Sequence, residues 1–242
     1  MKFPTPHVRR TAIALAVSIL VVGCSTSRHA SPDAPGSSKA SPGDGTAPSA
    51  GATSGHPSAT AAPDLDDWPT RPATADKFPH GIPSTVLAKG YTGSAFLEKV
   101  TEKWHIALGP RKKNDFSKKD DQPPVWYATG AGQHASGKLS IAVTWNLSGD
   151  LESLSCIAGR KTPGYADFLR DCIELDHPGA RPAAAARWLG SMVPSLDKAY
   201  AEARKPVGSP LYRAGRAASA LQEYSYGKEG MVYTVRTFGT AP

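Results

Sequence analysis

The chain has 242 residues, of which 40% are hydrophobic and 20% charged, and its 28 Lys and Arg against 21 Asp and Glu give a formal net charge of +7. Three basic residues, Lys2, Arg9 and Arg10, stand at the N-terminus without an acidic neighbour, and without residues 1–23 the charge falls to about +4. Nucleic-acid-binding proteins carry a much larger surplus, so the composition excludes that class and we expect no nucleic-acid partner.

The N-terminus has the pattern of a signal peptide. The basic residues precede an apolar run of about thirteen residues, 11–23, which is too short to span a bilayer and has the length of a signal-peptide core. The run leads into an aliphatic residue, another aliphatic residue, a small residue and a cysteine: Val21, Val22, Gly23 and Cys24. This order resembles the lipobox of bacterial lipoproteins.

The lipobox resemblance implies where the protein is held. In that family a diacylglycerol is attached to the cysteine sulfur and the chain is cut just before it, so residues 1–23 would be removed. Lipidated Cys24 would then anchor the protein on the extracytoplasmic side of the cell membrane. The alternatives are an ordinary signal peptide and an uncleaved anchor, and the export route, Sec or twin-arginine, stays open.

A polar segment follows the cysteine. From Ser25 to Asp64 the chain contains no Val, Ile, Leu, Met, Phe, Tyr or Trp. Such a segment cannot bury enough apolar surface to offset the entropy of ordering it. We therefore predict a disordered tether over 24–76, with a reach on the order of 35 Å, and a single globular domain over 77–242.

The globular part begins with a helix and a group of strands. Apolar residues at helical spacing predict the helix: Phe96, Leu97, Val100 and Trp104. Strands are predicted over 125–129 and 138–145, the second with strict alternation of apolar and small residues. NLSGD then supplies turn residues, and 151–158 returns as the partner strand of a hairpin.

Helices and a second hairpin are predicted in the C-terminal half. Thr162 as N-cap and Pro163 at the first helical position predict a helix start. Another helix begins near Pro182 and is predicted to break or kink at Pro194, with a shorter helix after it. Alternation in 217–238 predicts the last hairpin. The expected fold is α+β: an antiparallel sheet of four or five strands in two hairpins, with helices packed on one face, in the order helix, hairpin, helices, hairpin.

Cys156 and Cys172 are predicted to form a disulfide. Cys156 falls on the second strand of the first hairpin, and Cys172 falls on the apolar side of the following helix. Disulfides persist outside the cytoplasm, so pairing is the expected state there. Two buried free thiols are the alternative.

Two short motifs suggest chemistry that their surroundings do not support. GQHASGK, 132–138, has the spacing of a phosphate-binding loop, but it is followed by an alternating strand instead of a helix. SLDK, 195–198, has the S-x-x-K spacing of penicillin-recognising enzymes, but the companion motifs are absent. We interpret the first as a hairpin loop and Ser195 as a helix N-cap.

The sequence favours a binding or interaction domain of unknown protein or small-molecule ligand. It gives no catalytic, cofactor-binding or metal-binding residue, and no cofactor is expected. The alternatives are a cell-envelope hydrolase with an unrecognised active site and a structural envelope component. One basic segment is a candidate contact with anionic lipid headgroups or wall polymers, through Arg111, Lys112, Lys113, Lys118 and Lys119.

Overall fold

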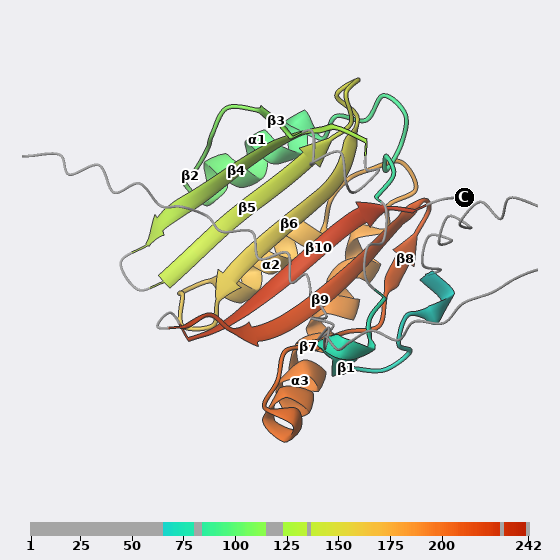
Figure 1. The fold of residues 1–242 in the computed structure, drawn as a ribbon. Helices are drawn as coiled ribbons and strands as arrows, with labels where there is room; N and C mark the ends of the chain where they lie inside the picture. The colour runs from blue at the N-terminus through green and yellow to red at the C-terminus, as the bar shows by residue number, and fades with distance from the viewer. Residues whose placement is uncertain (1–64, 80–83, 115–122, 135–136, 228–229, 241–242) are drawn as a thin grey trace, which may run out of the picture. The chain divides into compact units, whose positions relative to one another are not determined.

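The structure is a computed structural model that describes residues 65–79, 84–114, 123–134, 137–227 and 230–240. The lipobox, Cys24 and the tether up to residue 64 lie outside these residues. In the described part, no helix combines the length and the apolar character needed to cross a bilayer. This part has an α+β fold with an antiparallel sheet (Figure 1), which confirms the predicted fold class at that level.

The described strands form one sheet in the order β1-β7-β9-β10-β6-β5-β4-β2, with β3 also paired to β4 and β8 to β9. The strands are β1 (Ala73–Thr74), β2 (Ile106–Leu108), β3 (Lys112–Asn114), β4 (Val125–His134), β5 (Gly137–Trp145), β6 (Leu151–Gly159), β7 (Val207–Gly208), β8 (Tyr212–Ala214), β9 (Ala217–Ser225) and β10 (Met231–Gly239). Two hairpins do not account for this sheet. β4, β5 and β6 form a meander, and five strands of two or three residues are too short to leave a periodic pattern in the sequence.

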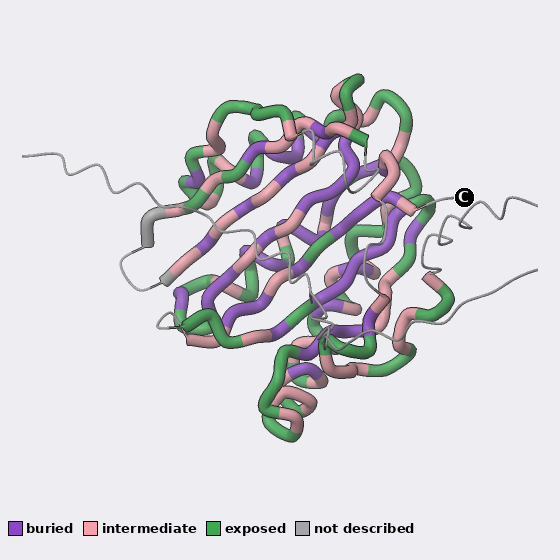
Figure 2. Tube along the Cα trace, in the orientation of Figure 1, coloured by how far each residue is buried: buried purple, intermediate pink, exposed green. Residues whose placement is uncertain are grey.

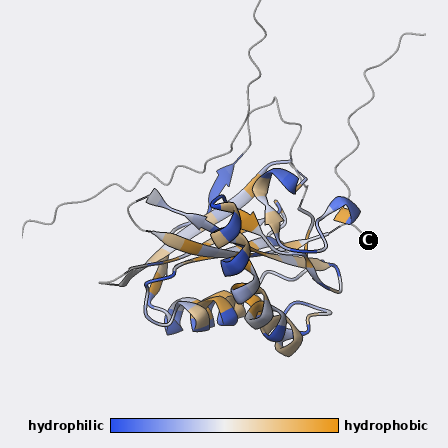
Figure 3. Ribbon diagram, turned by 90° about the horizontal axis from the view of Figure 1, so that it is seen from below, coloured by the Kyte–Doolittle hydropathy of each residue, from blue (hydrophilic) through white to orange (hydrophobic). Residues whose placement is uncertain are grey.

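Three α-helices lie on one face of the sheet: α1 (Ser94–Lys103), α2 (Tyr165–Ile173) and α3 (Pro182–Ala203). α2 packs on β6 and β10, and α3 packs on β7 and β9. Figure 3 shows this layer of helices beside the sheet, with hydrophobic segments in both layers. We call the side of the sheet that carries them the helix face, and the other side the open face.

The core lies between the helices and the helix face of the sheet. Along β5, four alternate residues are at most 1% exposed: Leu139, Ile141, Val143 and Trp145. Cross-strand partners continue this face, because Ile141 lies opposite Cys156 of β6, which lies opposite Val235 of β10. The alternation of buried and less buried residues is visible along the strands in Figure 2. The predicted apolar side of 138–145 is therefore confirmed.

The open face is covered at one end by the N-terminal part of the described chain. Trp68 and Phe78 contact each other edge to face with ring centroids 5.0 Å apart, and Trp68 also lies against Phe238 of β10. The Trp68 indole donates a hydrogen bond to the Ser209 carbonyl oxygen at 2.9 Å. We call residues 65–79 the strap. It includes the last residues of the predicted tether, which contact β10 through Trp68 and pair with β7 through Ala73 and Thr74.

α2 begins later than predicted. Its N-cap is Gly164, with φ of +75°, and Thr162 makes no capping contact although its side chain is buried. A left-handed residue at this position suits glycine, and a Cβ there would lie 3.2 Å from the Trp104 ring. The Thr162 N-cap prediction is wrong because the chain makes a turn before entering the helix.

α3 is continuous through Pro194, so the predicted break is wrong and Ser195 is not an N-cap. A proline inside a helix costs about 3 kcal/mol. Here the helix buries Leu189 on one side of the proline and Leu196 on the other, and this burial offsets the cost. The Ser195 hydroxyl donates back to the Ser191 carbonyl oxygen at 3.0 Å, which is a helix-interior hydrogen bond.

Candidate functional site

A groove with a volume of about 840 Å³ lies between α2 and α3. Apolar and small residues make up most of its lining, among them Leu169, Ala183, Ala186, Leu189, Val193 and Pro194. The volume falls in the range of ordinary ligand sites, which are lined mainly by apolar groups. The two helices therefore form a concave apolar surface on the side of the molecule away from the sheet.

Charged side chains also line the groove, and their charges balance. Asp167, Arg170 and Glu174 come from α2 and its C-terminal end, and Arg187 comes from α3. The Arg170 Nε atom lies 3.4 Å from a Glu174 carboxylate oxygen, an exposed pair one helical turn apart. Exposed pairs of this kind add little stability. With two acidic and two basic residues, the groove has no net charge that would select an ion.

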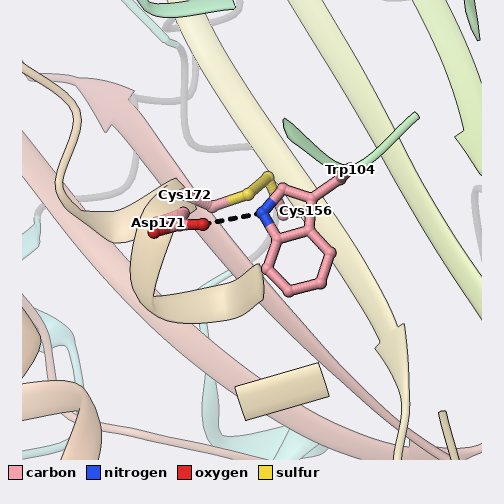
Figure 4. The surroundings of a disulfide bond; sticks show 4 residues. All are labelled: Trp104, Cys156, Asp171 and Cys172. Carbon is pink, nitrogen blue, oxygen red and sulfur yellow. Dashed lines mark hydrogen bonds between the residues drawn. A yellow bond between two sulfur atoms is a disulfide. The ribbon is translucent and has the colours of Figure 1, made fainter. Parts of the chain in front are cut away.

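The α2 wall of the groove is fixed by the disulfide between Cys156 on β6 and Cys172 on α2. The structure places this pair at bonding distance, with Cα atoms 6.4 Å apart, as the sequence predicts. Figure 4 shows Trp104 beside it, where the indole donates a hydrogen bond to Asp171 at 2.7 Å. The Lys103 ammonium lies 2.7 Å from the same carboxylate oxygen. These contacts tie α1 and α2 together.

The α3 side is held to the sheet by a polar cluster that the sequence interpretation missed. It consists of Asp197 on α3, Glu223 on β9, Tyr233 on β10 and Arg160 just after β6. The Tyr233 hydroxyl donates a short hydrogen bond to one Asp197 oxygen. Arg160 donates to the other Asp197 oxygen at 3.1 Å and lies 3.7 Å from a Glu223 oxygen. We call these four residues the carboxyl cluster.

Glu223 is the most buried acid of the cluster, with 1% of its surface exposed. Burial, and the negative charge of Asp197, raise the pKa of the Glu223 carboxyl to about 7, while Arg160 opposes the shift. Its Oε2 atom is buried without a hydrogen-bond partner. Burial and the hydrogen bond to Asp197 also raise the pKa of the Tyr233 hydroxyl above its ordinary value, so it stays a donor. Glu223 is therefore mainly protonated below about pH 7 and mainly ionised above it.

The position of Glu223 within its strand is the sequence feature from which a buried acid could have been predicted. Leu221 and Glu223 are alternate residues of β9 and share the helix face, where a charged residue is unexpected. The partner, Asp197, lies inside the SLDK motif that drew attention for Ser195. Sequence spacing alone could not show that these two acids meet across two layers.

The carboxyl cluster and the groove are neighbours but separate. None of the four cluster residues belongs to the groove lining. Val193 lines the groove, and Asp197 of the cluster lies one helical turn further along α3. The cluster therefore contributes to the groove by positioning one of its walls.

The structure describes three residues of the basic segment that is predicted to contact an anionic surface: Arg111, Lys112 and Lys113. Lys118 and Lys119 lie outside the described residues. The Arg111 guanidinium lies over the Trp145 ring, 4.0 Å from its centroid, so part of its surface is used in a cation–π contact.

The two remaining lysines point to different sides of the sheet. Lys112 and Lys113 are exposed neighbours in β3, and their partners in β4 are Tyr127 and Trp126. Neighbouring strand residues project from opposite faces. Lys112 therefore belongs to the open face and Lys113 to the helix face, and one flat surface cannot contact both equally.

The two motifs with catalytic spacing occupy structural positions. Residues 132–134 end β4 and residues 137–138 begin the antiparallel partner strand β5, so among the described residues Lys138 leads into a strand and not into the helix that a phosphate-binding loop needs. Ser195 and Lys198 lie within α3. His177 is buried, with Nδ1 3.1 Å from the Pro178 carbonyl oxygen, and burial lowers its pKa.

The groove and the carboxyl cluster are thus the two features of the described chain that could carry function. Among its described residues, His, Cys, Asp and Glu side chains do not gather in groups of three that could hold a metal ion. Comparison of the chain with models of protein families, with curated proteins and with solved structures found no match in any of the three.

Proposed function

We propose that the protein is a lipid-anchored extracytoplasmic binding protein whose groove between α2 and α3 accepts an apolar ligand. The observation that supports this most strongly is the groove itself, with a volume of about 840 Å³ and a mainly apolar lining. Burial of apolar surface gives roughly 25 cal/mol per Å². An apolar ligand would therefore gain more from this surface than an ion would from its balanced charges.

Gly190 allows the groove to be blocked without disturbing the fold. It lines the groove, and nothing lies within 4 Å of the position that a Cβ would take. Replacement by Ala should stabilise the helix by about 1 kcal/mol, since glycine is unfavourable in helices. The change Gly190→Glu should fill the groove and make it polar.

The test is a titration with the fluorescent apolar probe anilinonaphthalene sulfonate. We expect saturable binding to the wild-type chain and to Gly190→Ala, and a loss of at least about tenfold in affinity for Gly190→Glu, equal to 1.4 kcal/mol. Ala201→Glu is the matched control, because Ala201 is exposed on the same helix and does not line the groove. Equal probe binding by all four proteins would contradict the proposal.

The anchor is supported by the resemblance of Val21, Val22, Gly23 and Cys24 to a lipobox. Cys24→Ser removes the sulfur that would carry the lipid. We expect the variant to leave the membrane fraction or to stay uncleaved. A wild-type chain whose N-terminus is unlipidated by mass spectrometry would refute the anchor and leave the groove proposal standing.

One observation favours the hydrolase alternative. Two carboxyl groups in one cluster, one of them with a raised pKa, are typical of acid–base catalysis. In this protein, however, Tyr233 and Arg160 already bind Asp197, and the pair does not line the groove. We therefore assign the pair to structure. Hydrolysis of cell-wall material that is lost in Asp197→Asn would reverse this assignment.

A further inference from the structure

The carboxyl cluster joins side chains from four separate segments of the chain. Glu223 and Tyr233 are direct cross-strand partners on the helix face of β9 and β10. Asp197 reaches this pair from α3, and Arg160 reaches it from the segment after β6. The cluster therefore connects the second half of α3 to the centre of the sheet.

The number of protons in the cluster decides whether its charges balance. With Glu223 neutral, the positive charge of Arg160 faces the single negative charge of Asp197. With Glu223 ionised, one guanidinium faces two carboxylates, and the unpartnered Oε2 atom becomes part of a buried anion. Burying an incompletely paired charge is costly.

We propose that Glu223 acts, together with Asp197 and Arg160, as a proton-operated latch, which holds α3 on the sheet when Glu223 carries its proton and loosens the second half of α3 when the proton is lost. The latch is independent of what the groove binds. It concerns the attachment of one helix and stands on the geometry of four side chains from separate elements.

The charged and titratable groups that face Glu223 determine how the cluster responds to a change of pH. These are Asp197 from α3, the Tyr233 hydroxyl from β10 and the Arg160 guanidinium after β6. The cross-strand partner in β7 is Val207, which carries no charge. Burial and the hydrogen bond to Asp197 keep the Tyr233 hydroxyl protonated in this range. Proton loss from Glu223 is therefore the ionisation that changes the cluster near neutral pH.

The sign follows from proton linkage. The pKa of the Glu223 carboxyl is about 7 in the folded chain against 4.5 as the ordinary value. Between these values the unfolded chain loses the proton and the folded chain keeps it, so the folded state becomes less favoured as pH rises. The contribution is complete below about pH 4.5 and is lost once pH passes about 7.

The experiment compares urea unfolding of the full wild-type chain and Glu223→Gln from pH 5 to pH 8. We expect the folding equilibrium constant of the wild type to fall by about a hundredfold relative to the variant over this range. Other buried groups also titrate: burial raises the pKa of Glu152 and lowers that of His177. Taking the difference between two chains that share them removes their effect.

Glu202→Gln is the matched control, since it makes the same chemical change at an exposed position of α3. Its pH dependence should equal that of the wild type. An equal pH dependence for Glu223→Gln as well would overturn the latch.

Two measurements on the wild type keep the test decisive if Glu223→Gln does not fold. The carbon-13 chemical shift of the Glu223 carboxyl should titrate with a midpoint near 7, and a midpoint near the ordinary 4.5 would overturn the latch. Hydrogen-exchange protection factors should fall between pH 6 and pH 8 at amides 195–203 more than at amides of α2. Equal falls in both helices would overturn the loosening of α3.

Discussion

α2 and α3 lie side by side on the same sheet, but they are attached by different chemistry. α2 is bound covalently to β6 through Cys172 and buries Phe168, Leu169 and Ile173. α3 reaches the sheet through Leu189 and Leu196 and through the hydrogen-bonded carboxylate of Asp197. The comparison teaches that two helices of one layer can differ in their response to solution conditions, because a disulfide does not titrate and a carboxyl pair does.

The largest effect is expected at the disulfide. Removing it by changing Cys156 and Cys172 to Ala should lower the free energy of unfolding by about 3 kcal/mol, since the bond closes a loop of roughly 17 residues. The loss should be the same at pH 5 and pH 8. Chemical denaturation of both chains measures it, and a pH-dependent loss would erase the distinction between the two helices.

A smaller effect is expected at Tyr233. Tyr233→Phe keeps the ring, which stacks on Tyr165 with centroids 5.8 Å apart, and removes the donor to Asp197. Loss of a hydrogen bond to a charged, partly exposed carboxylate such as Asp197 costs about 2 kcal/mol.

Tyr224→Phe is the control for Tyr233→Phe. Its hydroxyl lies 3.2 Å from the Thr234 hydroxyl on the open face, in a partly buried position. We expect a loss of no more than about 1 kcal/mol there. Equal losses of unfolding free energy in the two variants, measured by urea unfolding at pH 5, would mean that the Tyr233–Asp197 hydrogen bond does not hold α3 more strongly than an ordinary contact between hydroxyl groups.

The smallest effect is expected on membrane binding by the basic segment. It compares the two faces of the sheet. Each lysine near an anionic membrane contributes at most about 1 kcal/mol. Because Lys112 and Lys113 project from opposite faces, Lys112→Ser and Lys113→Ser should weaken binding to phosphatidylglycerol vesicles unequally at low salt. The substitution that weakens vesicle binding more identifies the face of the sheet that approaches the lipid. Binding that neither substitution nor added salt changes would remove this segment from the membrane contact.

Elements with a clear hydrophobic period could be predicted from the sequence. β5 alternates strictly, and α1 carries Phe96, Leu97 and Val100 at helical spacing, so burial on one side of each follows directly. The Cys156–Cys172 pair could be predicted for the same reason, because each cysteine lies on a side that faces the core. The spacing of apolar residues in the sequence indicates which side of an element is buried, and the strand, the helix and the cysteine pair follow from that burial alone.

The rest depends on contacts between distant parts of the chain. β1 and β7 have two residues each, and only their pairing partners identify them as strands. The continuity of α3 depends on burial on both sides of Pro194, which a local rule about proline does not include. Asp197 and Glu223 look like separate surface acids until the fold brings α3 over β9. The groove has no local signal at all, because it arises from the spacing of two helices.

Pro194 has a consequence for what the groove can recognise. A proline has no N–H, so the carbonyl oxygen of Gly190, four residues earlier, cannot receive the usual helical hydrogen bond from it. Both residues line the groove. The α3 wall of the groove thus contains a carbonyl oxygen without its usual helical donor, and a ligand that carries a donor and reaches this oxygen would be held in one orientation as well as in place.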